Sequence, residues 1–275
     1  MITVRNLTKA FRGHTVLDSV EFKLPSNSII GLCGRNGAGK TTLIKLLLSI
    51  YNPNEGEVKN LSQHTKVIFD VPPQLNSLKV RDYLNFFALL YRDSVLSDTE
   101  VSEILNRVNL GAYKNKRVFQ LSYGMKKILY ISTLLLGETD LAVVDEPFNG
   151  LDPISLSIVK GIFLQVKADN NALILISSHL LNELADICEH FLIVKDADIR
   201  YIESISDESK KVRLVCSTPI EPYEILGDLG DITLNTSTSY DIVLSEGTSS
   251  ADVVRRLYER GIIFREIYYK NVINV

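Results

Sequence analysis

Apolar and polar residues alternate roughly along the first part of the chain. Residues 2–11 (ITVRNLTKAF) and 15–24 (TVLDSVEFKL) mix β-branched and apolar residues with polar ones. Gly13 and the run Pro25-Ser26-Asn27 follow them as turn signals. Residues 28–33 (SIIGLC) are almost continuously apolar, which is typical of a buried strand. The pattern therefore predicts two strands and then a buried one.

The period becomes helical in the next part of the chain. Residues 40–50 (KTTLIKLLLSI) are apolar on nearly all sides, which predicts a helix buried against a sheet. Between about 75 and 137 the pattern predicts a helical insert. Within it, Ser97 and Glu100 form the sequence of a capping box, and Gly111 follows the last apolar position.

Strands and helices alternate from residue 141 onward. Residues 141–147 (LAVVDEP) predict a short apolar strand that ends in acids. Residues 152–167 predict a helix with Pro153 at its first position, and residues 172–178 (ALILISS) predict another buried strand. This alternation predicts an α/β fold with a parallel sheet.

The last part of the chain follows a polar run, residues 203–211 (ESISDESKK), which is typical of a linker. The pattern beyond it predicts strand, helix, strand, strand, helix and strand, at residues 211–216, 222–229, 232–237, 240–246, 250–261 and 262–269. This order is that of a split βαβ domain. We therefore expect two domains, at residues 1–210 and 211–275, the second a small α+β domain.

The composition excludes several classes of protein. A chain of 275 residues with 45% hydrophobic residues can form one large domain, or a large and a small one. The formal net charge of -3 does not provide the basic surface that nonspecific binding of nucleic acid requires, so no nucleic acid is expected as partner. The three cysteines, odd in number and widely spaced, are typical of unpaired thiols in a reducing cytoplasm. No signal peptide and no apolar stretch of ~20 residues is present, so we expect a cytoplasmic chain that does not cross a membrane by itself.

Residues 34–41 (GRNGAGKT) match the pattern G-x-x-x-x-G-K-[ST], between a predicted strand and a predicted helix. Glycines let the backbone wrap round phosphate oxygens with its N–H groups pointing inward, and the helix N-terminus adds partial positive charge. Lys40 would reach the outer phosphates, and Thr41 would bind Mg²⁺. The expected phosphate-binding residues are Gly34, Arg35, Asn36, Gly37, Ala38, Gly39, Lys40, Thr41 and Thr42.

Two acids end the predicted strand at residues 141–147. Asp145 would hold Mg²⁺ directly or through water at the carboxyl edge of the sheet. Because side chains alternate along a strand, we expect Glu146 to point in a different direction, towards the attacking water. His179 ends the next core strand and could donate a hydrogen bond to the γ-phosphate. The alternatives are a solvated strand end for the acids and a structural role for the histidine.

Five motifs occur in a fixed order along the chain: GRNGAGKT, LSYGMKK, LAVVDEP, FNGLD and SSH. Together, over roughly residues 1–210, they resemble the ATP-binding cassette (ABC) ATPase family. The resemblance implies a P-loop NTPase core with antiparallel N-terminal strands and a helical insert. It also implies ATP and Mg²⁺ as cofactors, ATP hydrolysis as the activity, and Lys40, Glu146 and His179 as the catalytic residues.

The family's LSGGQ motif, here LSYGM at residues 121–125, reaches the ATP that another subunit holds. Ser122 and the following helix N-terminus would bind the γ-phosphate in trans, and Gly124 would permit close approach. Taken alone, Ser122 could simply cap the helix. Tyr123 and Met125 stand where Gly and Gln are commonest, so this motif departs from the usual form. The resemblance implies a second ABC ATPase subunit, identical or different, as a partner.

Three further positions follow from the resemblance. Phe11 stands where an aromatic residue usually stacks on adenine, although it could be a core residue of a strand. Asp152, in FNGLD, corresponds to a loop that communicates across the dimer, although it could cap the helix that begins at Pro153. The family's Gln that senses Mg²⁺ would fall near residue 70, where this chain has Asp70 as the candidate metal ligand and Gln74 four residues later.

The function that the resemblance implies is that of the ATP-hydrolysing subunit of an ABC transporter. Such a subunit dimerises around ATP, lies peripherally on the inner face of the cell membrane, and drives a separate integral membrane permease that contacts the helical insert. The short insert and small C-terminal domain resemble the branch that exports drugs, peptides or polysaccharides. The alternative is a soluble ABC ATPase in translation or DNA repair, but those proteins usually carry two cassettes or a long coiled coil. A GTP-binding switch fits less well, because VKAD at residues 166–169 lacks the Asn or Thr of the guanine-recognition tetrapeptide.

Overall fold

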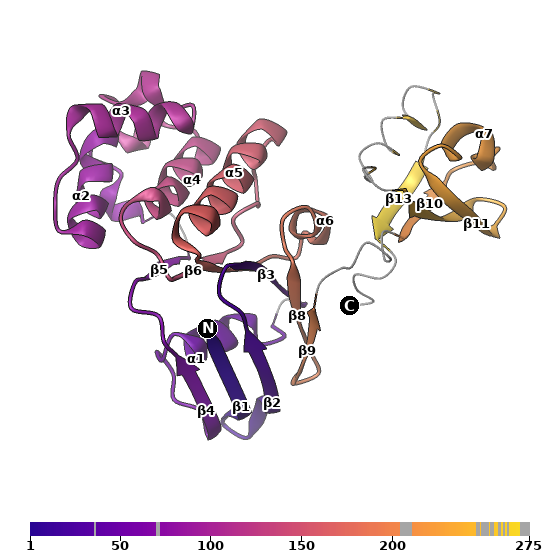
Figure 1. Ribbon diagram of the computed structural model, residues 1–275, viewed down its shortest axis with the longest axis horizontal. Helices are drawn as coiled ribbons and strands as arrows, with labels where there is room; N and C mark the ends of the chain where they lie inside the picture. Colours follow the sequence, from indigo (N-terminus) through magenta and orange to yellow (C-terminus); the bar gives the residue numbers. More distant parts are fainter. Residues whose placement is uncertain are drawn as a thin grey trace. The chain divides into compact units, whose positions relative to one another are not determined.

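The computed structural model (Figure 1) describes residues 1–35, 37–69, 72–203 and 211–245, and then 248, 253, 256–257, 260, 262 and 264–269. It divides into two compact units, Met1–Ile202 and Glu203–Val275. Asn36 and Asp70, two of the predicted site residues, lie outside the described residues. Residues 204–210, most of the predicted linker, lie outside them as well.

A three-stranded antiparallel sheet contains the N-terminus. Its strands, in the order β2-β1-β4, are β2 (His14–Leu24), β1 (Ile2–Phe11) and β4 (Glu55–Asn60). The first two confirm the strands predicted from alternation. They are joined by Arg12 and Gly13, whose φ angles of 47° and 83° are those of a two-residue turn that matches the twist of the strands.

A six-stranded sheet forms the centre of the first unit. Its order is β5-β6-β7-β3-β8-β9, and the first five strands are parallel. The bounds are β3 (Ser28–Cys33), β5 (Thr65–Ile68), β6 (Leu141–Asp145), β7 (Leu173–Ser177), β8 (His190–Lys195) and β9 (Asp198–Glu203). Strands β3, β6 and β7 confirm the predicted buried strands, whose continuous apolar character reflects burial on both faces.

Helix α1 (Lys40–Leu47) packs between the two sheets (Figure 1). Its leucines join one buried cluster with residues of both sheets, among them Val4, Leu24, Leu32 and Val143. The helix is shorter than the predicted span 40–50. Ser49, with φ of 57°, adopts a left-handed conformation that a helix cannot continue.

The predicted helical insert is confirmed. It contains α2 (Val80–Arg92), α3 (Asp98–Arg107) and α4 (Tyr123–Ser132), with short 3-10 turns η1 (Pro73–Leu75), η2 (Gly111–Tyr113), η3 (Val118–Gln120) and η4 (Thr133–Leu135). Ser97 and Glu100 form the expected capping box at the start of α3. Helices α2, α3, α4 and α5 (Pro153–Asn170) lie on the side of the six-stranded sheet opposite β1, β2 and β4 (Figure 1), and α6 (Leu181–Ala185) follows β7.

None of the helices that the structure describes has the length and apolar character needed to cross a bilayer.

The second unit contains a four-stranded antiparallel sheet in the order β11-β12-β10-β13. Its elements are β10 (Lys211–Cys216), α7 (Pro222–Leu226), β11 (Gly230–Thr236), β12 (Ser239–Leu244) and β13 (Phe264–Tyr269). The first and third strands of the unit are thus neighbours in the middle of the sheet, as in a split βαβ arrangement. The helix predicted at residues 250–261 lies largely outside the described residues.

The three cysteines are buried and none forms a disulfide. Burial raises the pKa of the Cys33 thiol to about 12, and the charge of Lys40 opposes this only in part. Burial also raises the pKa of Cys188 and Cys216. Since the thiolate is the reactive form, these cysteines are chemically inert at neutral pH.

Candidate nucleotide-binding site

A cavity of about 370 Å³ lies at the carboxyl edge of the parallel sheet, next to the end of β6. Three segments line it: the start of β2, the loop before α1 together with the first residues of that helix, and the end of β6 together with the residue that follows it. The lining residues are His14, Val16, Arg35, Gly37, Gly39, Lys40, Thr41, Thr42, Asp145 and Glu146. Ligands of open parallel sheets bind outside the carboxyl ends of the strands, so this cavity is the candidate functional site.

The loop before α1 requires glycine at two positions. Gly34 has φ of 153°, and a Cβ there would lie 2.6 Å from the carbonyl oxygen of Val194. Gly39, the N-cap of α1, has φ of 109°, and its Cβ would lie 2.8 Å from Cγ1 of Val16. Both positions combine a left-handed conformation with a backbone or side chain at close range. The loop can therefore take this path only with glycines, as a phosphate cradle needs.

Lys40 is the first residue of α1, and only 9% of it is exposed. Its Nζ donates hydrogen bonds to the carbonyl oxygens of Gly34 (2.6 Å) and Arg35 (3.3 Å). The ammonium group thus lies within the loop, beside the N-terminus of α1 with its free N–H groups. Both favour an anion at the same place. Ala38, which precedes Gly39 in the loop, is partly buried and packs against the hydrophobic core.

Asp145 and Thr41 offer oxygen atoms to one cavity. Asp145 is the last residue of β6, and its carboxylate accepts a hydrogen bond from the hydroxyl of Ser177, its register partner on β7. No cluster of three or more acidic, histidine or cysteine side chains that could hold a metal is present among the described residues. The donor set fits Mg²⁺, which is usually held by one or two protein groups together with substrate phosphates.

The Glu146 turn begins where β6 ends. Glu146 has φ of 46°, so it is not a strand residue, and the alternation expected between Asp145 and Glu146 is not what orients it. Its backbone N–H donates to the carbonyl of Ser177 (2.9 Å). Its carboxylate Oε2 lies 3.0 Å from Nδ1 of His179 and accepts a hydrogen bond from the side-chain amide of Asn149 (3.1 Å). The structure therefore brings Glu146 and His179 together.

Helix α4 begins at the second predicted anion site. Ser122 is its N-cap, and the hydroxyl oxygen accepts a hydrogen bond from the backbone N–H of Met125 (3.2 Å). This confirms the capping interpretation. A Cβ at Gly124 would lie 3.6 Å from Leu151 and Ser155, an ordinary contact, so packing within this chain does not require glycine there. The role of Ser122 and Gly124 toward the nucleotide of another subunit stays a prediction.

The structure places Phe11 beside the cavity lining but not in it. Its ring is 40% exposed and lies edge-on to Tyr51, with ring centroids 5.6 Å apart. Its cross-strand partner His14 lines the cavity, together with Val16. Neither His14 nor Val16 was predicted. Their i, i+2 spacing on β2, which puts them on one face, is the signal that could have found them.

Asp152 caps α5. Its carboxylate accepts hydrogen bonds from the backbone N–H groups of Ser155 (2.9 Å) and Ile154 (3.0 Å), and from the Ser155 hydroxyl (2.9 Å). These hydrogen bonds lower the pKa of Asp152 below its usual value, and the bond from the backbone N–H of Ser155 contributes most. The capping interpretation is confirmed, and the role across a dimer stays a prediction. Gln74, the alternative to Asp70, is exposed in η1.

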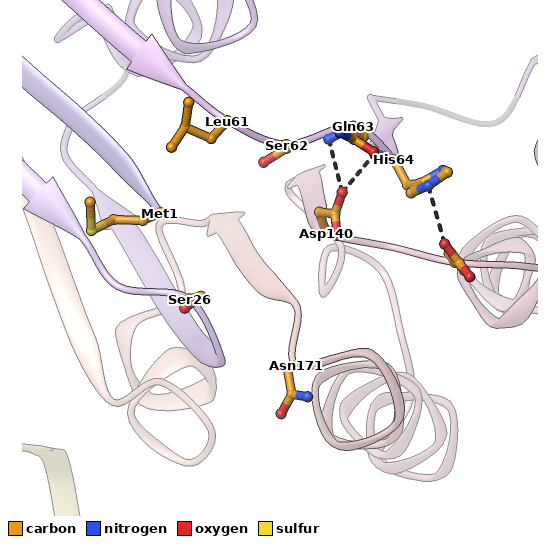
Figure 2. Close-up of a pocket in the computed structure, with 9 residues that line it drawn as sticks. Met1, Ser26, Leu61, Ser62, Gln63, His64, Asp140 and Asn171 are labelled. Atoms are coloured by element: carbon orange, nitrogen blue, oxygen red, sulfur yellow. Dashed lines mark hydrogen bonds and ion pairs between the residues drawn. The ribbon is translucent and has the colours of Figure 1, made fainter.

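A second cavity, of about 320 Å³, lies at the amino edge of the parallel strands (Figure 2). Figure 2 shows Asp140 between the backbone N–H groups of Gln63 and His64, from which it accepts hydrogen bonds of 2.8 and 2.9 Å. Nε2 of His64 lies 3.1 Å from the carboxylate of Glu138. These charged groups are already held by the fold, so the cavity at the carboxyl edge is the stronger candidate.

Comparisons with known proteins agree with this site. A family model described as ABC transporter matches residues 17–149, which include the loop before α1 and the Glu146 turn. The uncharacterized ABC transporter ATP-binding protein YcbN of Bacillus subtilis (strain 168) is 32% identical over 219 residues, which cover 76% of this chain and 70% of that protein. The bacitracin transport ATP-binding protein BcrA of Enterococcus faecalis is 28% identical over 286 residues, which cover 97% of this chain and 91% of that protein.

A solved ATP-binding subunit of an ABC transporter has a similar structure. Its TM-score is 0.65 at 26% sequence identity, over 75% of this chain and 91% of that one. This similarity confirms the predicted P-loop fold, and the relatives confirm ATP as the ligand. The chain belongs to the family of ABC transporter ATP-binding proteins, and it is an ATPase of this family, whose members hydrolyse ATP to drive transport.

Proposed function

We propose that this chain pairs with a second ABC ATPase subunit around ATP, and that hydrolysis drives export through a separate membrane permease. The observation that carries the proposal is that one chain contains two segments with the backbone chemistry that favours an anion. One is the loop before α1, and the other is the N-terminus of α4 with exposed Ser122. In a head-to-tail pair, each ATP phosphate would meet the loop of one subunit and Ser122 of the other.

The chemistry is transfer of the γ-phosphoryl group to water. The loop N–H groups and Lys40 would stabilise charge on the phosphate oxygens. Glu146 would orient the water and take its proton, while Asn149 and Nδ1 of His179 hold the carboxylate in place. His179 would also support the γ-phosphate. Thr41 and Asp145 would hold Mg²⁺, which would supply positive charge to the phosphate oxygens. Asp70 or Gln74 would sense the bound metal.

Pairing around ATP converts hydrolysis into motion. A shift from ~1% to ~99% associated subunits requires ~5.5 kcal/mol of differential binding, which a ligand provides only through contacts that the separated state lacks. ATP that touches both subunits meets this requirement, and loss of the γ-phosphate removes several of its contacts. Hydrolysis would thus let the subunits part.

The helical insert supports a membrane partner. Phe86, Leu89 and Leu90 on α2 are 46%, 51% and 63% exposed, an apolar surface that suits contact with another protein. Similarity to a bacitracin transport protein extends over nearly the whole chain, including the second unit, which supports the export branch. Such a subunit would lie on the inner face of the cell membrane.

The Glu146→Gln variant tests the catalytic assignment. We expect ATP binding to persist while hydrolysis slows by about 100-fold or more, because a general base typically contributes that much. With Mg²⁺ and ATP the variant should accumulate as a dimer, measured by light scattering. Glu21→Gln, at an exposed acid on β2, is the matched control. A wild-type rate would remove Glu146 from its role, and a monomer at high concentration would contradict the pairing.

Copurification tests the transport partner. The tagged chain, extracted with its native membranes in mild detergent, should bring down a polypeptide with several apolar spans. Recovery with ribosomes or DNA and no such polypeptide would instead support a soluble ABC ATPase.

A further inference from the structure

A lysine of helix α4 contacts the backbone of the Glu146 turn. Nζ of Lys127 donates hydrogen bonds to the carbonyl oxygens of Glu146 (2.6 Å) and Asn149 (3.1 Å). Hydrogen bonds from a charged donor are shorter and stronger than neutral ones. The lysine therefore joins both ends of the turn, residues 146–149, to α4.

The Glu146 turn needs such restraint. Glu146 is a residue with a Cβ in the left-handed region, with φ of 46°, a conformation that persists only where the surroundings hold it. Its N–H donates to Ser177 on β7, and its carbonyl accepts from Lys127 on α4. The two sides of this one residue are thus fixed by two different elements, a strand and a helix.

The same contacts fix the direction of the carboxylate. Asn149 accepts a hydrogen bond from Lys127 through its carbonyl and donates one to Glu146 Oε2 through its side-chain amide. Lys127 itself bonds the backbone of the turn and acts on the carboxylate through Glu146 and Asn149. Loss of its ammonium would leave the left-handed residue and the amide of Asn149 less well placed.

We propose that Lys127 is a positioning residue for ATP hydrolysis, which holds the Glu146 turn in its active geometry and couples it to helix α4. This inference rests on the proposed role of Glu146. In the proposed pair, Ser122 at the start of α4 and Glu146 of the same chain serve different ATP molecules. Lys127 then links the two sites within one polypeptide.

Two substitutions of Lys127 in the full chain test the proposal. Lys127→Met keeps the apolar stem and removes the donor, and we expect kcat to fall about tenfold or more with little change in KM for ATP. Lys127→Arg keeps a charged donor and should stay within about threefold of wild type. Lys23→Met, at an exposed lysine on β2, is the matched control. Thermal unfolding checks that each variant folds, and Lys127→Gln replaces the methionine variant if it does not.

The second arm combines Lys127→Met with Glu146→Gln. If the lysine acts through Glu146, the double variant should hydrolyse ATP in a single turnover no more slowly than Glu146→Gln alone. Wild-type kcat in Lys127→Met, equal losses in the arginine and methionine variants, or the same loss in both Glu146 backgrounds would each overturn the proposal. Full activity in Glu146→Gln would instead overturn the proposed role of Glu146, on which this inference rests.

Discussion

The two edges of the six-stranded sheet use charged groups in different ways. At the amino edge, Asp140 accepts two backbone N–H groups. Lys66, the second residue of β5, is buried, and its Nζ donates to the carbonyl oxygens of Leu134 (3.2 Å), Leu136 and Gly137 (3.3 Å). Both charged side chains hydrogen-bond to backbone groups of neighbouring segments, so they stabilise the fold.

At the carboxyl edge, the charged groups face a cavity instead. Lys40 donates its hydrogen bonds to described residues within its own loop, the carbonyls of Gly34 and Arg35, and the carboxylate of Glu146 contacts His179, which is half exposed. A ligand can compete for these groups without unfolding the sheet. The comparison leads us to expect that a charge at the amino edge acts on stability and that a charge at the carboxyl edge acts on ATP binding or hydrolysis.

The largest effect is expected for Lys40→Ala. We expect ATP affinity to fall about a hundredfold or more, because in the proposed site the ammonium would reach the outer phosphates from its nearly buried position. The midpoint of thermal unfolding should change little, since the lost hydrogen bonds lie within one loop. Nucleotide titration followed by fluorescence measures the affinity, with Lys23→Ala as the control. Unaltered affinity would show that the loop is not a phosphate cradle.

The next largest effect is the pH dependence that Lys66 gives to the free energy of unfolding. Burial lowers the pKa of Lys66 to about 8, whereas an unfolded lysine titrates near ~10.4. Between these pH values the unfolded form of Lys66 binds more protons than the folded form, so the contribution of this residue to the free energy of unfolding should rise with pH, by up to about 3 kcal/mol. Below about pH 8 the residue is charged in both states and contributes no slope.

Lys66→Met should remove this rise. Denaturant unfolding of wild type and variant at several values between about pH 7.5 and about 9.5 measures it as a difference in slope, in which the opposing contribution of the buried cysteines cancels. Lys23→Met should keep the wild-type slope. Equal slopes for wild type and Lys66→Met would contradict the burial argument.

The smallest effect is expected for Asp140→Ala. The hydrogen bonds from the backbone N–H groups of His64 and Gln63 lower the pKa of Asp140. Their loss should cost about 1 kcal/mol of unfolding free energy and leave kcat unchanged. Because the folded pKa is depressed, the difference from wild type should be complete above about pH 4 and vanish as pH falls through the folded pKa. Glu103→Ala, at an exposed acid of α3, is the control, and a fall in kcat would break the distinction between the edges.

The sequence predicted those strands whose pattern is set by burial. Strands β3, β6 and β7 are continuously apolar because both faces are covered. Strand β4 (EGEVKN) was missed, since it is largely exposed and its sequence carries no alternation of apolar and polar residues. Strands β5, β8 and β9 were not predicted either. Between β8 and β9, Asp196 and Ala197 adopt φ of 51° and 64° without the glycine that would announce such a turn.

The residues of the candidate site also differ in how well the sequence predicts them. Lys40 and Thr41 follow the glycines in one continuous segment, so local chemistry predicts them. Lys127 and Glu146 are 19 residues apart, on a helix and a turn, and only packing brings them together. The contact of Val16 with Gly39 likewise depends on how β2 lies against the loop. The motifs contain Lys127, Glu146 and Gly39 separately, but the contacts of these residues are found in the folded chain alone.

The buried cysteines have a practical consequence. Cys33, Cys188 and Cys216 are all shielded, and each has a raised pKa. A maleimide dye will therefore find its target almost exclusively at a cysteine introduced on the surface, because a normal exposed thiol ionises far more readily. The native chain can thus be labelled for single-molecule fluorescence, and the approach and separation of two subunits followed, without first removing its own thiols.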